Sequence, residues 1–300
     1  MPPRLDLERW LGSGSSHSSV RTASKTDYAR VVTLARYGWA LRSHIVGPER
    51  IVTGEQVDAV TRSGVLDLRG RSRVRALLYR ELLAGTPNRA TISVAGTRVE
   101  LGSSGDFDVD WKAFVEVFGH QSYSAYYADS HVLDIGAHKG YFGAFALAKG
   151  AKTVVSFEPE AKNYAALERA ARKLGSRWLA RNAAVGPSSG TGVLLRDRTS
   201  WAHSLVAVER PDGQQLVEIS TLERALAELP AGGMRTIVKI DAEGSECGIL
   251  SRPDALDHVD VLMVEWHSNA PCTAAELSSV VKSSGLLAVD EPSGILRFER

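Results

Sequence analysis

The chain has few cysteines and no long apolar segment. Its 300 residues include two cysteines, Cys247 and Cys272, from which we expect no disulfide framework, and neither cysteine has a spacing typical of a metal site. No stretch approaches the roughly 20 apolar residues of a membrane span, and the first residues lack the apolar run of a signal peptide. These absences favour a cytoplasmic protein with no membrane insertion.

The sequence also lacks two phosphate-binding motifs. It has no Gly-x4-Gly-Lys-Ser/Thr loop, and residues 134–140 carry His138 where a dinucleotide fingerprint has its central glycine. Asp134, at the end of a predicted strand, also disfavours a phosphate group, because a carboxylate repels an anion but accepts a hydrogen bond from an ammonium. Nicotinamide dinucleotides and nucleoside triphosphates are therefore poor candidates for the ligand.

A nucleotide-cofactor site is nevertheless indicated by two successive strand ends. Gly136 and Gly140 allow the chain to turn tightly after Asp134, and a helix beginning near Tyr141 presents unpaired backbone amides there. Glu158 follows 24 residues after Asp134, at the end of the next strand, where a carboxylate accepts the hydroxyls of a ribose. An adenosine that carries an ammonium fits, so the predicted cofactor is S-adenosyl-L-methionine; the alternative is a strand-to-helix turn without a ligand.

Three segments are predicted along the chain. Residues 1–26 are rich in glycine and serine and predict a flexible tail. Residues 27–110 predict a small α+β module, and residues 111–300 predict the cofactor-binding domain. The module's expected elements are helices at Tyr28–Ile45 and Val74–Leu83 and a hairpin of Thr91–Val94 with Thr97–Leu101.

Strands and helices then alternate regularly, which is typical of a parallel sheet. A Ser220–Glu223 capping box predicts where the helix at Thr221 begins, and residues 190–220 predict a β-rich insertion over the site. The expected strands are His131–Ala137, Thr153–Phe157, Trp178–Val185, Ile237–Asp241, Val259–Glu265, Leu286–Val289 and Ile295–Phe298. The expected helices are Tyr141–Lys149, Ala161–Leu174, Thr221–Leu229 and Ala274–Ser284.

Charge is unevenly distributed. Residues 1–100 contain 16 lysines and arginines against 9 acidic residues, whereas residues 101–300 contain 20 against 26. A basic run at Arg69, Arg71, Arg73 and Arg75 suits RNA phosphates or an anionic substrate, but it has no interleaved aromatic residues. Docking on the acidic domain, or simple solvation, is the favoured interpretation of this run.

Four motifs together resemble the FkbM-like family of S-adenosylmethionine-dependent class I methyltransferases. They are Asp134–Phe142, Phe157–Pro159, Asn182–Gly186 and Lys239–Gly244, each at a predicted strand end. The resemblance implies an α/β, Rossmann-like fold with a seven-stranded, mostly parallel sheet and helices on both faces. It also implies O-methylation of a small molecule. His138 replaces the asparagine that is usual in the family's first loop.

The resemblance also implies positions for the cofactor. Glu158 would hold the ribose and Pro159 would border the adenine, while Asp134 with Gly136 would hold the methionine part. The predicted cofactor-binding residues are Asp134, Gly136, His138, Gly140, Tyr141, Phe142, Glu158, Pro159, Asn182, Ala183 and Asp241.

Methylation of a hydroxyl requires a base. Asp241, at the fourth strand end, is the first candidate, with an N-cap of the next helix as the alternative role. His267 is the second, and Glu265, two residues earlier, is expected to orient its imidazole. His203, in the insertion, is the third. No metal is expected, because successive side chains beyond a strand end diverge.

The predicted acceptor is a small hydroxylated molecule, such as a saccharide, glycolipid or secondary metabolite. One alternative is an RNA methyltransferase that uses the basic N-terminal module, although a nucleic-acid partner is disfavoured. A second alternative is a cofactor-binding scaffold without catalysis. Pairing of N-terminal helices between subunits would give a homodimer.

Overall fold

The computed structural model describes residues 4–5, 20–21, 51–84, 88–289 and 295–300. Most of the predicted tail at 1–26 and the whole predicted helix Tyr28–Ile45 lie outside these residues. Within the tail, β1 (Arg4–Leu5) and β2 (Val20–Arg21) are two-residue strands that pair antiparallel.

A seven-stranded sheet forms the centre of the molecule, with strand order β13-β14-β12-β11-β5-β6-β7. The five strands from β12 to β7 run parallel, and β14 pairs antiparallel with both β12 and β13. The predicted α/β fold with a mostly parallel sheet is therefore confirmed. The strands are β5 (Ser130–Ile135), β6 (Thr153–Phe157), β7 (Trp178–Arg181), β11 (Arg235–Ile240), β12 (Val261–Val264), β13 (Leu287–Val289) and β14 (Leu296–Glu299).

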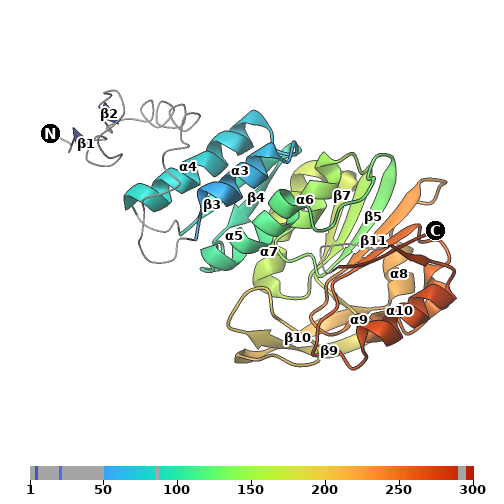
Figure 1. Cartoon of the computed structure of the whole chain (residues 1–300). Coiled ribbons are helices and arrows are strands. Elements are labelled where there is room, and N and C mark those ends of the chain that lie inside the picture. Colours follow the sequence, from blue (N-terminus) through green and yellow to red (C-terminus); the bar gives the residue numbers. More distant parts are fainter. Residues whose placement is uncertain (1–3, 6–19, 22–50, 85–87, 290–294) are drawn as a thin grey trace.

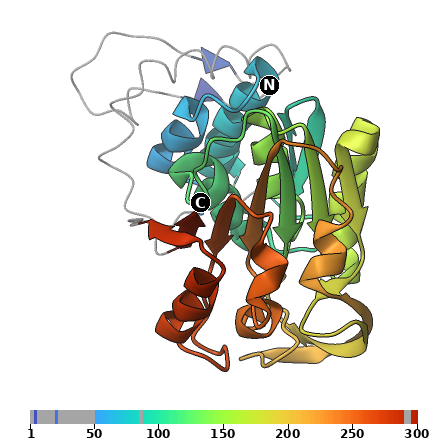
Figure 2. The same cartoon turned by 90° about the vertical axis from the view of Figure 1, so that its right-hand side faces the viewer.

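The central strands are apolar because both faces of the sheet are covered. Neighbouring residues of one strand enter different hydrophobic clusters, as alternation of side chains across a sheet requires. Val132 of β5 and Ile237 of β11 belong to one cluster, whereas Leu133 and Val238 belong to the other. Helices pack on both faces, as Figures 1 and 2 show.

Each face has its own set of helices. The first cluster includes buried residues of α5, α6 and α7, and the second includes buried residues of α8, α9 and α10. The helices are α5 (Phe107–Val115), α6 (Tyr141–Ala148), α7 (Ala161–Ala171), α8 (Leu222–Leu226), α9 (Glu246–Ile249) and α10 (Ala274–Ser283).

The N-terminal module packs on the first face. It contains α3 (Gly54–Arg62), α4 (Leu68–Ala84) and the predicted hairpin, observed as β3 (Ala90–Val94) and β4 (Thr97–Leu101). Its buried residues, among them Val57 and Ile92, belong to the same cluster as Phe145 and Leu167 of the sheet-covering helices. The expected boundary at 110/111 falls inside α5, so the core is continuous across it.

A buried ion pair ties the first sheet loop to this module. Lys139 donates to the carboxylate of Asp110 in α5 and to Ser104 Oγ, and both charged side chains are fully buried. Asp110 also accepts a bond of 2.6 Å from the amide of Gly102. Burial raises the pKa of Asp110 to about 6 against the opposing effect of Lys139. A buried charge that loses its partner is strongly destabilising, so this pair fixes the loop's position.

Two sequence predictions of local structure are wrong. The predicted strand Trp178–Val185 divides in two: β7 stays in the central sheet, whereas β8 (Ala184–Val185) joins β10 (Pro211–Ser220) and β9 (Gly190–Asp197) in a second sheet. The predicted capping box is displaced by one residue. Thr221, not Ser220, is the N-cap of α8 and accepts from the amide of Arg224, because Ser220 is still paired in β10.

No helix of the described ranges combines the length and the apolar character that crossing a bilayer requires.

The turn after β5 requires glycine for a steric reason. Gly136 has φ of +73°, and a Cβ atom there would lie 1.7 Å from the carbonyl oxygen of Asp241. The amide of Asp241 in turn donates to the carbonyl of Ile135 at 3.1 Å. The ends of β5 and β11 therefore touch through their backbones at this glycine.

Gly136→Ala is expected to lower the free energy of unfolding by about 3 kcal/mol or more, because it combines backbone strain with a clash. Gly64→Ala is the matched control: Gly64 has φ of +77° but no atom within 4 Å of the added Cβ. That control should lose only about 1–2 kcal/mol. Urea unfolding of both variants measures the difference, and equal losses would contradict the close contact.

Candidate functional site

A cavity of about 390 Å³ opens at the carboxyl ends of the parallel strands, where α/β sheets bind their ligands. Its walls come from the loops after β5, β6, β11 and β12, and from the segment between β9 and β10. That last segment contributes Ser200, Trp201, Ala202 and His203. The predicted insertion thus covers the site.

The cavity has two ends. We call them the Glu158 end, after the residue that follows β6, and the His267 end, after the residue that lies beyond β12. Strands β5 and β11 lie between β6 and β12 in the sheet. At the usual spacing of about 4.8 Å per strand, the two ends are on the order of 14 Å apart. A ligand that contacts both ends must be elongated.

Glu158 is a buried carboxylate in the cavity wall. Its Oε2 accepts from the amide of His138 at 2.8 Å, and its Oε1 accepts from the amide of Glu160 at 2.9 Å. Burial raises the pKa of Glu158 to about 8, against the lowering effect of these two amides. Each oxygen keeps a further lone pair, so the carboxylate can still accept hydroxyl groups from a ligand.

His138 lines the same end in a left-handed backbone conformation, with φ of +50°. Asparagine and histidine are among the few non-glycine residues that adopt this region readily, which explains how His138 stands in the position of an asparagine. Its Nε2 lies 3.2 Å from Ser200 Oγ of the insertion. Burial lowers the pKa of His138 well below its usual value, so the ring is neutral.

The predicted cofactor residues divide into those that line the cavity and those that lie behind its wall. The lining residues are Gly136, His138, Glu158, Pro159, Ala183 and Asp241. Of the others, Asp134 is fully buried and contacts Ser156 Oγ and Lys239, and Asn182 donates to the carbonyls of Glu158 and Pro159. Gly140 begins α6, where a Cβ would meet Leu167 and Trp178. The remaining two, Tyr141 and Phe142, are buried in α6.

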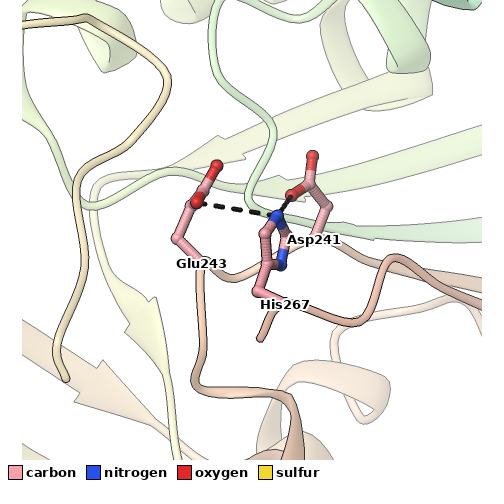
Figure 3. Close-up of side chains that lie close together, drawn as sticks. All are labelled: Asp241, Glu243 and His267. Atoms are coloured by element: carbon pink, nitrogen blue, oxygen red, sulfur yellow. Dashed lines mark ion pairs between the residues drawn. The ribbon is translucent and has the colours of Figure 1, made fainter. Parts of the chain in front are cut away.

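Three ionisable side chains converge at the His267 end, as Figure 3 shows. His267 Nε2 lies 3.6 Å from Glu243 Oε2 and 3.9 Å from Asp241 Oδ1. One ligand atom from each of the three residues lies within 4.8 Å of the others. The expected divergence of side chains beyond the strand end does not occur, because Glu243 adopts φ of +50° and the chain turns back.

Glu246 orients the imidazole of His267. Its Oε1 lies 2.9 Å from His267 Nδ1 and also accepts from the amides of Ala242 and Gly244. The expectation that Glu265 does this is wrong, since Glu265 accepts from the hydroxyl of Tyr123. Nor is Asp241 a helix cap, because Ser245 precedes α9. Glu246 was not identified from the sequence, because no pattern along the chain shows that it faces His267.

The His267 end has an excess of negative charge. Burial and the nearby Asp241 carboxylate raise the pKa of Glu243 to about 8 and that of Glu265 to about 7. Burial opposes a charged imidazole, but Glu246, Glu243 and Asp241 outweigh it and raise the pKa of His267 to about 9. The imidazole therefore carries a proton at neutral pH.

His203 lies elsewhere in the cavity wall. Its Nδ1 accepts from the amide of Asp197 at 2.9 Å, within the insertion. Burial lowers the pKa of His203, and its charge interactions are with Glu160, Arg196, Asp197 and Asp106 rather than with Asp241. The structure thus brings Asp241 and His267 together but not His203.

Comparison with known families identifies the domain that forms this site. Residues 134–279 match the family model described as Methyltransferase FkbM domain. Residues 134–279 thus form an FkbM methyltransferase domain. A methyltransferase domain agrees with the predicted cofactor, S-adenosylmethionine. None of the curated proteins compared with the chain matches it.

Solved structures show distant similarity. The FkbM methyltransferase from Methylobacillus flagellatus KT has 13% identity and a TM-score of 0.42, over 82% of this chain and 58% of that chain. A putative RNA methyltransferase from Pyrococcus horikoshii has 12% identity and a TM-score of 0.37, over 64% and 84%. M. jannaschii TYW2 in complex with AdoMet has 11% identity and a TM-score of 0.37, over 73% and 89%.

A disulfide next to the site of this FkbM methyltransferase domain was not expected from the sequence. Cys247 and Cys272 are bonded, with their Cα atoms 6.0 Å apart. Cys247 directly follows Glu246, and the carbonyl of Cys272 accepts from Trp266 Nε1 beside His267. The disulfide therefore links helix α9, which begins at Glu246, to the segment after β12 that carries His267. The pairing could not be predicted, because nothing in the sequence indicates that these two cysteines are close in space.

Reduction of this disulfide is expected to lower the free energy of unfolding by about 2–4 kcal/mol, because a 25-residue separation is released in the unfolded chain. Urea unfolding with and without dithiothreitol measures the change. The double variant Cys247→Ser/Cys272→Ser should unfold at the reduced midpoint under both conditions. Identical midpoints for the untreated and reduced wild type would contradict the link.

Proposed function

We propose that this FkbM methyltransferase transfers a methyl group to a hydroxyl of a small molecule, such as a saccharide, glycolipid or secondary metabolite. The observation that carries the proposal is a single cavity with a buried carboxylate at one end and the Asp241, Glu243 and His267 side chains at the other. An elongated cofactor held at the first end directs its reactive group toward the second.

The Glu158 end fits the adenosine part of S-adenosylmethionine. The Glu158 carboxylate has lone pairs free for two ribose hydroxyls, and the apolar side chains of Phe157, Ala183 and Val185 offer a surface for the adenine ring. When bound, the cofactor supplies an electrophilic methyl group on a sulfonium. The carboxylates near Asp241 favour that positive charge by Coulomb attraction.

The His267 end fits an acceptor hydroxyl and its proton. An aliphatic hydroxyl is a poor nucleophile unless a base removes its proton as the new bond forms. Asp241 is the proposed base, because its carboxylate lines the cavity and lies 3.2 Å from Lys239 Nζ, which holds it in place. His267, protonated at neutral pH, donates a hydrogen bond to an acceptor oxygen. His203, whose Nδ1 already accepts from the amide of Asp197, is the weakest of the three predicted catalytic candidates.

The alternative functions have less support. The proposed RNA-binding run includes Arg71 and Arg73, whose guanidinium groups donate to the carbonyls of Leu66 and Thr91 within the module. A scaffold without catalysis does not require the converging groups at the His267 end. The homodimer stays a prediction.

Cellular location is a second open prediction. The sequence favours the cytoplasm, whereas the Cys247–Cys272 disulfide favours an oxidising compartment, since stable disulfides are rare in the cytosol. The state of the two cysteines in freshly lysed cells, trapped with an alkylating reagent, tests the cytoplasmic location.

Glu158→Ala is expected to weaken binding of S-adenosylmethionine roughly tenfold or more, because it removes hydrogen bonds to a charged acceptor. Calorimetric titration measures the change, with S-adenosylhomocysteine as a second ligand. Glu209→Ala, an exposed glutamate outside the cavity wall, is the control and should bind as the wild type does. Absence of binding to wild-type protein would contradict the proposed function.

Asp241→Asn is expected to lower the rate of methyl transfer by about 10²–10⁴-fold, since the amide cannot accept the proton. The measurement uses a labelled methyl donor and a panel of hydroxylated acceptors. His203→Asn should retain most of the activity, because that residue faces the insertion. A larger loss in His203→Asn than in Asp241→Asn would move the base to the insertion.

A further inference from the structure

The Asp241, Glu243 and His267 side chains have the geometry of an incomplete metal centre. Both carboxylates face the same imidazole nitrogen, at 3.6 and 3.9 Å, beyond hydrogen-bond length. Bonds from a cation to nitrogen and oxygen ligands are about 2.0–2.2 Å long, so two ligands of one cation lie about 3.4 Å apart in tetrahedral geometry and about 4.2 Å apart on opposite sides. The two observed separations therefore leave room for one cation.

A buried carboxylate behind His267 provides a second, independent observation. Metal-ligating histidines usually donate their other ring N–H to a carboxylate, which fixes the tautomer and aims the free nitrogen at the metal. Glu246 occupies that position: it is fully buried, its Oε1 lies 2.9 Å from Nδ1, and two backbone amides hold it rigidly. Its Oε2 is buried and has no hydrogen-bond partner in the described part of the chain.

Acidic side chains gathered around the three residues also favour a cation. Glu265 and Glu116 add two carboxylates to the same cavity wall, and Glu246 adds another behind it. Lys239 faces this group but is shared with Asp134 and with the carbonyl of Gly136. Five carboxylates thus face one shared lysine and one histidine.

We infer that Asp241, Glu243 and His267 bind a divalent cation through His267 Nε2 and one oxygen of each carboxylate. A mixed nitrogen and oxygen set favours Mn²⁺, Fe²⁺, Co²⁺ or Zn²⁺ over Mg²⁺ and Ca²⁺, which prefer oxygen alone. Binding displaces the Nε2 proton, while the Nδ1 proton stays on the hydrogen bond to Glu246. Three protein ligands leave positions open to oxygen atoms in the cavity.

The consequence for the reaction rests on the proposed function. A hydroxyl of the acceptor that completes the coordination loses its proton more readily, because the cation stabilises the alkoxide. Asp241 then binds the cation through one oxygen and accepts the hydroxyl proton with the other. An acceptor with two adjacent hydroxyls would fill two open positions at once.

The test is titration of the full-length chain, freed of metal with EDTA, with Mn²⁺ alone. Electron paramagnetic resonance of free Mn²⁺ reports binding without cofactor, acceptor or turnover, so its outcome is separate from that of the methyl-transfer assay. One Mn²⁺ per chain is expected. His267→Ala and Glu243→Gln should each weaken binding roughly tenfold or more.

Matched controls are His258→Ala and Glu209→Gln, exposed residues outside the cavity wall, which should bind Mn²⁺ as the wild type does. Circular dichroism shows whether each variant is folded. If His267→Ala does not fold, Glu243→Gln decides. Co²⁺ provides a second readout, since its visible absorption should show a nitrogen ligand that His267→Ala removes. No Mn²⁺ binding by wild type, or binding unchanged in both site variants, would overturn the inference.

Discussion

The buried ammonium of Lys239 joins the parts of the site that lie far apart in the sequence. It donates to the carbonyl of Gly136 at 2.7 Å and lies 3.6 Å from Asp134 and 3.2 Å from Asp241. Burial disfavours its charge, but the surrounding carboxylates more than compensate and raise the pKa of Lys239. Without this cation, two carboxylates at neighbouring strand ends would repel each other in a medium that screens poorly. That repulsion would push apart the ends of β5 and β11, which are in close backbone contact at Gly136.

Much of this arrangement could be predicted from the sequence, because strand ends in a parallel sheet meet at one edge. Asp134, Glu158 and Asp241 each follow an apolar run, and topology alone brings them to the same rim. Which of these residues line the cavity and which lie behind its wall could not be predicted in this way. Whether Asp134 faces a ligand or Lys239 depends on side-chain packing across β5 and β11, which leaves no periodic signal along the chain.

The unpredicted features share a second cause: they are contacts between loops. Glu246 reaches His267 because Glu243 turns the chain back in a left-handed conformation, and Cys247 then lies near Cys272. The departure of β8 from the central sheet is also a loop effect, since Asn182 bonds to the carbonyls after β6 and redirects the chain. Secondary-structure propensity predicts strands and helices well but does not predict these contacts outside regular structure.

The second sheet separates the cavity wall from the register of the central sheet. In the described part of the chain, the strands β9 and β10 pair with each other and with the two-residue strand β8, and not with the seven-stranded sheet. Changes in length or sequence between Asp197 and Pro211 therefore leave the register of the central strands untouched. Such changes would instead reshape the part of the cavity wall that Ser200, Trp201, Ala202 and His203 form, including the contact of Ser200 with His138.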